Sequence, residues 1–254
     1  MRILLTNDDG IQAVGLRAMH AALVAAGHEV HVVAPVTEQS AVGHAITLAA
    51  PLRVKEFRDE GFFGLGVTGT PADCVKLALS TLVKEKPDMV ISGINAGANV
   101  GVDILYSGTV SAATEGALMG CAAMAVSMDD FNPRDLSSQA AYAVALLPRL
   151  PLDRLPEKCV LNLNFPVRPV EEMLGLRLCP HTRVAYEDWF EERLDPRGRP
   201  YYWMCGELKA DRISQGRDRR LLTEGWATLT PLKFDFTDHE MLGVLEPMLS
   251  GTPC

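Results

Sequence analysis

The chain has 254 residues, of which 48% are hydrophobic and 22% are charged, and its formal net charge is −8. This composition predicts a globular protein long enough for one large core with an appendage. The acidic balance argues against a nucleic-acid polymer as partner, because such proteins present a basic face. No run of about 18 apolar residues is present, so we expect no membrane-spanning helix and no membrane partner.

The six cysteines are scattered along the chain and include no CxxC pair. This pattern predicts reduced thiols in a cytoplasmic protein, and it argues against a disulfide framework or a zinc site. The N-terminal apolar run is short and ends in acidic residues, which does not match a secretory signal. We therefore expect a cytoplasmic location.

The first predicted element is a buried strand, an apolar run over residues 3–5 that stops at the turn residues 7–10. Asp8 and Asp9 follow it, and two carboxylates there would lie at the carboxyl edge of a parallel sheet, where open α/β sheets bind ligands. Adjacent anions repel unless a cation separates them, so a hard divalent metal is the natural candidate. The alternative is that these residues only form a turn.

A helix and a second strand come next. Residues 14–26 are rich in Ala and Leu and predict the helix, and residues 28–34 predict the strand. The crossover between the two strands should be right-handed, with the strands parallel. The following loop, residues 36–44, therefore leaves the second strand at the same edge as the two aspartates, and it carries Ser40 and His44.

Residues 46–57 mix polar and apolar side chains and predict a β-excursion. The helix after it should begin with Thr70 as N-cap and Pro71 at the first position, and it should run to about residue 83. Asp73 at the third position completes an acidic variant of the capping box, so we interpret it as a cap and not as a catalytic group.

Residues 88–92 predict the next strand, and Asn95 leaves it at the same sheet edge within a glycine-rich loop. Residues 106–109 then open a helix of small residues over 110–119. Ser, Gly and Thr at a helix N-terminus offer free N–H groups, hydroxyls and the positive end of the helix dipole. This segment is therefore a candidate phosphate site, with a simple helix cap as the alternative.

The remaining pattern completes an α/β fold on a mainly parallel sheet. The further predicted elements are strands at 122–128, 159–165 and 228–232 and helices at 137–147 and 238–249. Residues 181–220 differ in character, because they are polar and irregular yet contain six aromatic side chains. These must bury against the main domain or a second subunit, so we expect this arm and the last helix to build a homodimer.

Three strand ends thus bring oxygen donors to one edge, from Asp8 and Asp9, from Ser40 and from Asn95. An all-oxygen set suits Mg²⁺, Mn²⁺ or Ca²⁺ better than zinc. A divalent ion beside the phosphate site would be a layout for metal-assisted hydrolysis of a phosphoester. Taken alone, Ser40 is better explained as a turn hydroxyl. His44 is a candidate for orienting a ligand or donating to phosphate.

Five motifs in this order and spacing resemble the SurE family of stationary-phase survival proteins: MRILLTNDDG, EQSAVGHAIT, VTGTPADCV, SGINAGANVG and YSGTVSAATEG. They cover residues 1 to about 130 densely. The similarity continues more thinly through LNLNFP, the turn at residues 195–198 and EGWATLTP. One departure is Ala45, which follows His44 where other members often have Ser.

The resemblance implies a metal-dependent nucleotidase that hydrolyses nucleoside 5′-monophosphates, with 3′-monophosphates and short polyphosphate as further candidate substrates. It implies one Mg²⁺ or Mn²⁺ per subunit on four residues and a phosphate-side loop beside them. The metal ligands would be Asp8, Asp9, Ser40 and Asn95, and the phosphate-side residues would be Asn99, Ser107, Gly108 and Thr109, with His44 as a further candidate.

The fold implied is a Rossmann-like, three-layer catalytic domain over residues 1–178. Residues 179–254 would form an extended arm, a last core strand and a C-terminal helix that exchange between subunits of a homodimer or homotetramer. For the reaction, either Asp9 helps to deprotonate or orient a water, or an aspartate attacks phosphorus directly.

Two other functions stay open at the level of sequence. One alternative is a phosphatase that acts on another small phosphoester. A phosphatase of the haloacid-dehalogenase type is disfavoured, because that type separates its two aspartates by one residue and here they are adjacent. A nucleotide-binding stress sensor without turnover is disfavoured because a pure binding protein has no need of the paired acids.

Overall fold

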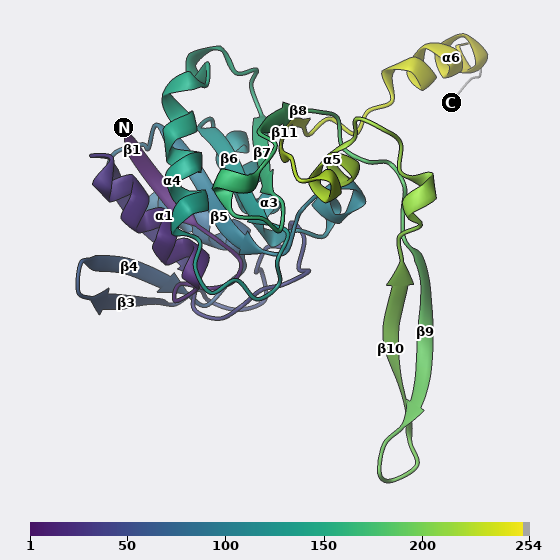
Figure 1. The fold of residues 1–254 in the computed structure, drawn as a ribbon, viewed down its shortest axis with the longest axis horizontal. Helices are drawn as coiled ribbons and strands as arrows, with labels where there is room; N and C mark the ends of the chain where they lie inside the picture. Colours follow the sequence, from purple (N-terminus) through teal and green to yellow (C-terminus); the bar gives the residue numbers. More distant parts are fainter. Residues whose placement is uncertain (251–254) are drawn as a thin grey trace.

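The computed structural model describes residues 1–250, so Cys254 lies outside the described part of the chain. At its centre is a nine-stranded sheet with the order β3-β4-β2-β1-β5-β6-β7-β11-β8 (Figure 1). Its strands are β1 (Arg2–Thr6), β2 (Glu29–Pro35), β3 (Val54–Asp59), β4 (Phe62–Val67), β5 (Met89–Ala96), β6 (Ala122–Met128), β7 (Cys159–Phe165), β8 (Leu176–Leu178) and β11 (Ala227–Lys233).

The sheet is mainly parallel, and β3 and β11 are the strands that pair antiparallel to a neighbour, with β4 and β7 respectively. The chain moves outward from β1 in two directions, because β2 pairs on one side of β1 and β5 on the other. This arrangement makes the carboxyl ends of β1 and β5 the topological switch point, the place where open α/β sheets form a ligand crevice.

Helices cover both faces of the sheet and give the predicted three layers (Figure 1). Helices α1 and α4 pack together on one face, and α2 and α3 pack together on the other. The α-helices are α1 (Val14–Ala25), α2 (Pro71–Leu77), α3 (Gly108–Leu118), α4 (Ser137–Leu146), α5 (Asp218–Glu224) and α6 (His239–Leu249). Short turns complete the chain: η1 (Ala78–Leu82), η2 (Gly101–Leu105), η3 (Leu147–Arg149), η4 (Leu152–Arg154), η5 (Val170–Glu172) and η6 (Ala210–Arg212).

The core explains why β1 is apolar without alternation. Ile3 and Leu5 pack with the residues under α1 and α4, whereas Leu4 packs with the residues under α2. A strand buried on both faces has no solvent side and therefore no polar period. The same burial holds the start of the following turn rigidly in place.

The capping box predicted for α2 is confirmed. Thr70 Oγ1 accepts from the Asp73 backbone N–H at 3.1 Å, and Asp73 Oδ2 accepts from the Thr70 backbone N–H at 2.9 Å. The helix ends earlier than predicted, because regular α-helix stops at Leu77 and continues as the π-helical turn η1.

Three elements differ from the sequence prediction. The β-excursion is a hairpin of β3 and β4, and β4 joins the main sheet parallel to β2. Strand β8 and helix α5 had no predicted counterpart. β8 has three residues, and α5 is a charged seven-residue helix that ends at Gly225, whose φ is +101°, so both are too short for a periodic signal.

The predicted arm is an antiparallel hairpin of β9 (Glu187–Leu194) and β10 (Pro200–Glu207) that projects away from the domain (Figure 1). Its large aromatic side chains are exposed, with Trp189 at 52%, Phe190 at 66% and Trp203 at 58%. The main domain of the same chain therefore does not bury them. No helix within residues 1–250 is both long and apolar enough to cross a membrane.

Candidate active site

A cavity of about 730 Å³ opens at the switch point of the sheet. Six of the predicted site residues line it, and they come from β1, the loop after β2, the end of β5 and the approach to α3. These residues are Asp8, Asp9, Ser40, Asn95, Asn99 and Ser107. The volume is in the range typical of small-molecule sites.

Asp8 and Asp9, hereafter the acid pair, follow β1 in a turn that is stabilised by the residues on either side of them. Asn7 Nδ2 donates to the Gly10 carbonyl at 2.9 Å, and Gly10 has a φ of +100°, a conformation that favours glycine. Asp8 is 5% exposed, and its Oδ1 accepts a hydrogen bond from the Thr109 hydroxyl. Asp9 Oδ2 accepts from the Ala96 backbone N–H at 3.0 Å.

Burial disfavours the charged form of both carboxylates. It raises the pKa of Asp8 to about 6, even though the hydrogen bond from Thr109 acts in the opposite direction. Burial and the adjacent charge of Asp8 raise the pKa of Asp9 to about 7. Within residues 1–250 neither carboxylate forms an ion pair with a Lys, Arg or His side chain. The acid pair is thus a buried site for negative charge without a cationic partner from the described chain.

The loop after β2 brings Ser40 to the acid pair. The Gln39 backbone N–H donates to the Asp8 carbonyl at 2.8 Å, and the Gly43 N–H donates to the Tyr106 carbonyl at 2.9 Å. The loop is therefore tied at both ends to the segments that it faces. The Ser40 hydroxyl donates to Glu38 Oε1 at 2.6 Å, which leaves its oxygen lone pairs available to a ligand.

Asn95 lies at the end of β5, where the pairing register with β6 shifts after Ser92. Its Nδ2 donates to the Gly97 carbonyl at 2.7 Å. Because the amide nitrogen is engaged within its own loop, the oxygen Oδ1 is the atom that remains for a ligand in the cavity.

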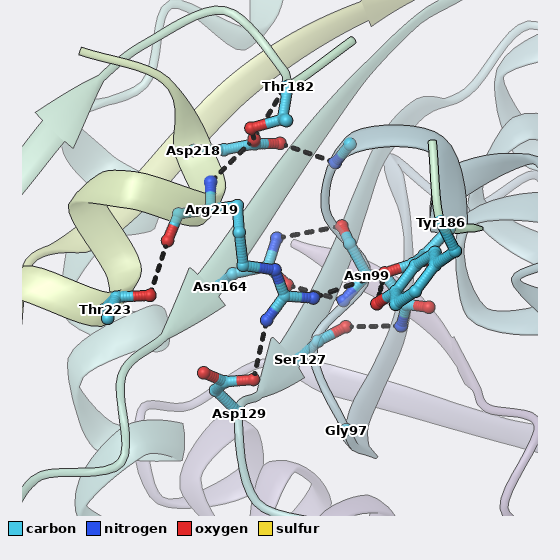
Figure 2. Close-up of polar contacts among 12 residues, drawn as sticks. Gly97, Asn99, Ser127, Asp129, Asn164, Thr182, Tyr186, Asp218, Arg219 and Thr223 are labelled. Carbon is cyan, nitrogen blue, oxygen red and sulfur yellow. Dashed lines mark hydrogen bonds and ion pairs between the residues drawn. The ribbon is translucent and has the colours of Figure 1, made fainter. Parts of the chain in front are cut away.

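Asn99 is held in place by hydrogen bonds with two residues of β7. Its backbone N–H donates to Asn164 Oδ1 at 2.9 Å, and its carbonyl accepts from Asn162 Nδ2 at 2.8 Å. Its own Nδ2 donates to the Ser127 hydroxyl at 2.8 Å (Figure 2). Nδ2 carries a second hydrogen, so Asn99 still has one donor to offer.

The start of α3 packs directly against the acid pair. Ser107 caps the helix, with its Oγ accepting from the Val110 N–H at 3.0 Å. A Cβ on Gly108 would lie 2.8 Å from the Cβ of Asp8, so only glycine allows this approach. Gly108 and Thr109 are buried behind Asp8 and do not line the cavity, whereas Ser107 does.

His44 is not among the residues that line the cavity. Its Nε2 lies 2.8 Å from Glu115 Oε2, and Lys76 Nζ lies 2.7 Å from the other oxygen of that carboxylate. Burial acts to raise the pKa of Glu115, but His44 and Lys76 together hold it below its ordinary value. The structure therefore places His44 in a charge cluster around the buried Glu115 of α3 and not in the lining of the cavity.

Several cavity residues were missed by the sequence analysis, namely Glu38, Asp103, Asp129, Tyr186 and Arg219. Asp129 follows β6 directly, so the strand-end rule that found the acid pair could also have found it. Arg219 could not have been found, because it reaches the cavity from α5, which had no sequence signal.

The donor set fits a hard divalent cation. Within residues 1–250 no group of three or more His, Cys, Asp or Glu side chains is arranged for a metal, so a site here depends on mixed oxygen donors. The acid pair supplies two carboxylates, Ser40 a hydroxyl and Asn95 an amide oxygen. These ligands suit Mg²⁺ or Mn²⁺, and a cation would offset the raised pKa values of the acid pair.

Comparisons with known proteins agree over nearly the whole chain. A family model described as "Survival protein SurE" matches residues 3–188. A protein named 5′-nucleotidase SurE from Nitratidesulfovibrio vulgaris (strain DSM 19637 / Miyazaki F) is 64% identical over 245 residues, which is 96% of this chain and 91% of that protein. Another of that name from Maridesulfovibrio salexigens is 63% identical over 97% of this chain and 98% of its own.

The fold comparison agrees as well. The crystal structure of the SurE protein from Aquifex aeolicus matches with a TM-score of 0.84 and 34% sequence identity, and it covers 98% of this chain and 99% of that one. The chain therefore belongs to the SurE family.

Proposed function

We propose that the protein is a divalent-metal-dependent nucleotidase that hydrolyses nucleoside 5′-monophosphates to nucleoside and phosphate. The observation that carries this proposal is the acid pair, in which Asp8 is buried and Asp9 half-buried beside the start of α3 at the switch point, with no basic partner in the described chain. The names of the relatives, 5′-nucleotidase SurE, support the same reaction and the 5′-position.

In this proposal Asp8, Asp9, Ser40 and Asn95 hold one Mg²⁺ or Mn²⁺ per subunit. The ion, when bound, polarises a phosphoryl oxygen and makes a water more acidic. The fit of the donor set described above supports this assignment, and Mg²⁺ and Mn²⁺ share these ligands.

The other roles in the reaction are assigned to residues of the chain itself. Asp9 is the group that orients the attacking water or removes its proton, because it is more exposed to the cavity than the buried Asp8. Ser107, which precedes α3, and the free donor of Asn99 line the cavity and would stabilise the charge of the equatorial phosphoryl oxygens. Gly108 and Thr109 act from behind by holding Asp8 in place.

We further propose a homodimer or homotetramer that exchanges residues 179–254 while residues 1–178 form the catalytic domain. The exposed aromatic side chains of β9 and β10 support this arrangement. A cytoplasmic location is supported by the five described cysteines, all of which are free thiols.

The test is phosphate release from a panel of nucleoside 5′- and 3′-monophosphates and short polyphosphate, with Mg²⁺, with Mn²⁺ and with a chelator. We expect metal-dependent release that is fastest for 5′-monophosphates. Release from other phosphoesters but from no nucleotide would overturn the substrate, and metal-independent release would overturn the assignment of the acid pair.

A further inference from the structure

The cavity has a second end, which the metal and phosphate chemistry does not use. Its residues come from η2, the loop after β6, the root of the arm and helix α5, and we refer to them as the distal wall. The distal wall consists of Asp103, Asp129, Phe131, Tyr186 and Arg219, all of which line the same cavity as the acid pair.

Asp218 fixes the position from which Arg219 enters the cavity (Figure 2). This carboxylate is fully buried and accepts from the Thr182 N–H and hydroxyl, both at 2.7 Å, and from the Gly101 N–H at 2.9 Å. It therefore joins the first residue of α5 to the loop that follows Asn99. Because α5 is anchored in this way, the next side chain points toward the sheet edge.

Arg219 in turn holds two carboxylates in the cavity (Figure 2). Its Nη1 lies 3.1 Å from Asp129 Oδ1, and its Nη2 lies 3.2 Å from Asp103 Oδ2, which also accepts from the Tyr186 hydroxyl at 3.3 Å. Within residues 1–250 no hydrogen bond is made by Asp103 Oδ1 or Asp129 Oδ2. Each carboxylate thus keeps one free acceptor on a side chain that Arg219 has already oriented.

Phe131 supplies an aromatic face at the rim of the cavity. Phe131 is 86% exposed, yet its ring packs against the loop that follows β5, since a Cβ on Gly97 would be 2.8 Å from Phe131 Cε1. An exposed aromatic ring at a cavity rim is suited to stacking on a planar ligand, and stacking of this kind accepts any nucleobase.

We infer that the distal wall binds the nucleoside part of the substrate, with Phe131 stacked on the base and the Asp103 and Asp129 carboxylates accepting from the ribose hydroxyls. This inference rests on the proposed function. Arg219 and Tyr186 are positioning residues that orient the two carboxylates. The strand order supports the assignment. Asp129 follows β6, and the acid pair follows β1, which is two strands away in the sheet. Two strand spacings amount to about 10 Å, which is the length scale of a nucleotide.

The charge of the distal wall selects a neutral donor over a second anion. Two carboxylates face one guanidinium there, so the local charge is negative and would repel a further phosphate. Ionised carboxylates are acceptors only, and a vicinal diol is a matching pair of donors. The distal wall therefore fits a nucleoside better than the tail of a polyphosphate.

The test compares substrates that contain successive parts of a nucleotide: AMP, 2′-deoxy-AMP, ribose 5-phosphate and a simple alkyl phosphate. We expect Phe131→Ala to lower kcat/KM for AMP roughly 5- to 100-fold and to leave ribose 5-phosphate within about twofold. Phe131→Tyr should keep the wild-type value, and Phe63→Ala, an exposed aromatic on β4 outside the cavity, is the matched control.

Asp129→Asn tests the contact with ribose. It should lower kcat/KM for AMP and ribose 5-phosphate roughly 10-fold, with a smaller loss for 2′-deoxy-AMP and none for the alkyl phosphate. Arg219→Met should raise KM for AMP while kcat stays within about twofold, because it positions the binding groups and leaves the acid pair intact.

An equal loss for all four substrates in these variants, or no loss for any, would overturn the inference. The outcome is distinguishable from failure of the proposed function. If the proposed function fails, the wild type itself releases no phosphate from AMP. Calorimetric binding of adenosine to the wild type and to Phe131→Ala would then still decide the role of the distal wall. Weaker adenosine binding by the variant supports it, and equal binding contradicts it.

Discussion

At the scale of single residues, the acid pair supports the proposal that this cavity holds a cation. A buried carboxylate is stable when it is neutralised by a proton, by a basic side chain or by a metal ion. Asp8 and Asp9 have no basic partner in the described chain, and burial raises their pKa values to about 6 and about 7, so below about pH 6 protons neutralise the pair in the metal-free protein. In the proposed site a divalent ion and protons would therefore compete for the same oxygens.

This competition predicts the pH dependence of metal binding. The carboxylates must lose their protons to act as ligands, so Mn²⁺ affinity should rise as the pH increases through about 6 to 7 and level off above that range. Calorimetry in buffers of different ionisation enthalpy should show protons released on binding at pH 6 and fewer at pH 8. Affinity that stays constant from pH 5 to pH 8 would contradict the pKa values assigned to the acid pair.

Gly108 provides a second prediction at this scale. A methyl group there would lie 2.8 Å from Asp8 Cβ and 2.9 Å from its Oδ2, so Gly108→Ala must displace the carboxylate or the start of α3. We expect kcat for nucleotide hydrolysis to fall about 10-fold or more, since small misplacements of a positioned group are costly. Ser80→Ala, at an exposed position in η1 outside the cavity, is the control and should retain full activity.

At the scale of elements, the features predicted from the sequence are those with a local cause. The acid pair, Asn95 and the Thr70 cap follow from an apolar run that ends in polar residues or from a capping pattern. Arg219 reaches the cavity only because Asp218 anchors α5 to a loop more than 100 residues earlier, and such a contact has no local signal. The prediction for His44 rests on its position in the loop after β2 and on the motif, whereas its placement depends on Glu115 from α3.

The cap of α2 predicts a stability effect that should be separable from catalysis. The Thr70 hydroxyl accepts from the Asp73 N–H and donates to the Ala45 carbonyl at 2.7 Å, so Thr70→Ala removes both bonds. The expected loss is about 1 kcal/mol, or a decrease in Tm of about 2–4 °C, measured by calorimetry. Thr81→Ala, at an exposed position in η1, should leave Tm unchanged, and an equal effect in both variants would argue against the cap.

At the scale of the whole molecule, the arm and α6 leave a large apolar surface uncovered. None of the α6 side chains is buried, and Met241, Leu242 and Leu245 are 48%, 53% and 41% exposed. Surfaces of this kind on a globular protein mark association sites. In Figure 1 both elements stand away from the domain, so a second subunit could reach them without rearrangement of the sheet.

This surface predicts the state of association. The protein should sediment as a dimer or tetramer, and Leu242→Glu with Leu245→Glu should shift it toward the monomer, because charges cannot be buried in an apolar interface without a partner. Val24→Glu, a half-exposed residue on α1, is the matched control and should leave the association unchanged. A wild-type protein that sediments only as a monomer would contradict the exchange of residues 179–254.

The most direct test of the central claim is the rate of phosphate release from AMP as Mn²⁺ is titrated into the metal-free protein and into its Asp8→Asn variant. We predict no release in chelator, a rate that rises to saturation with Mn²⁺ for the wild type, and a loss of roughly 100-fold or more in the variant. Full release in the presence of chelator, or wild-type rates in Asp8→Asn, would show that the acid pair does not hold a catalytic metal.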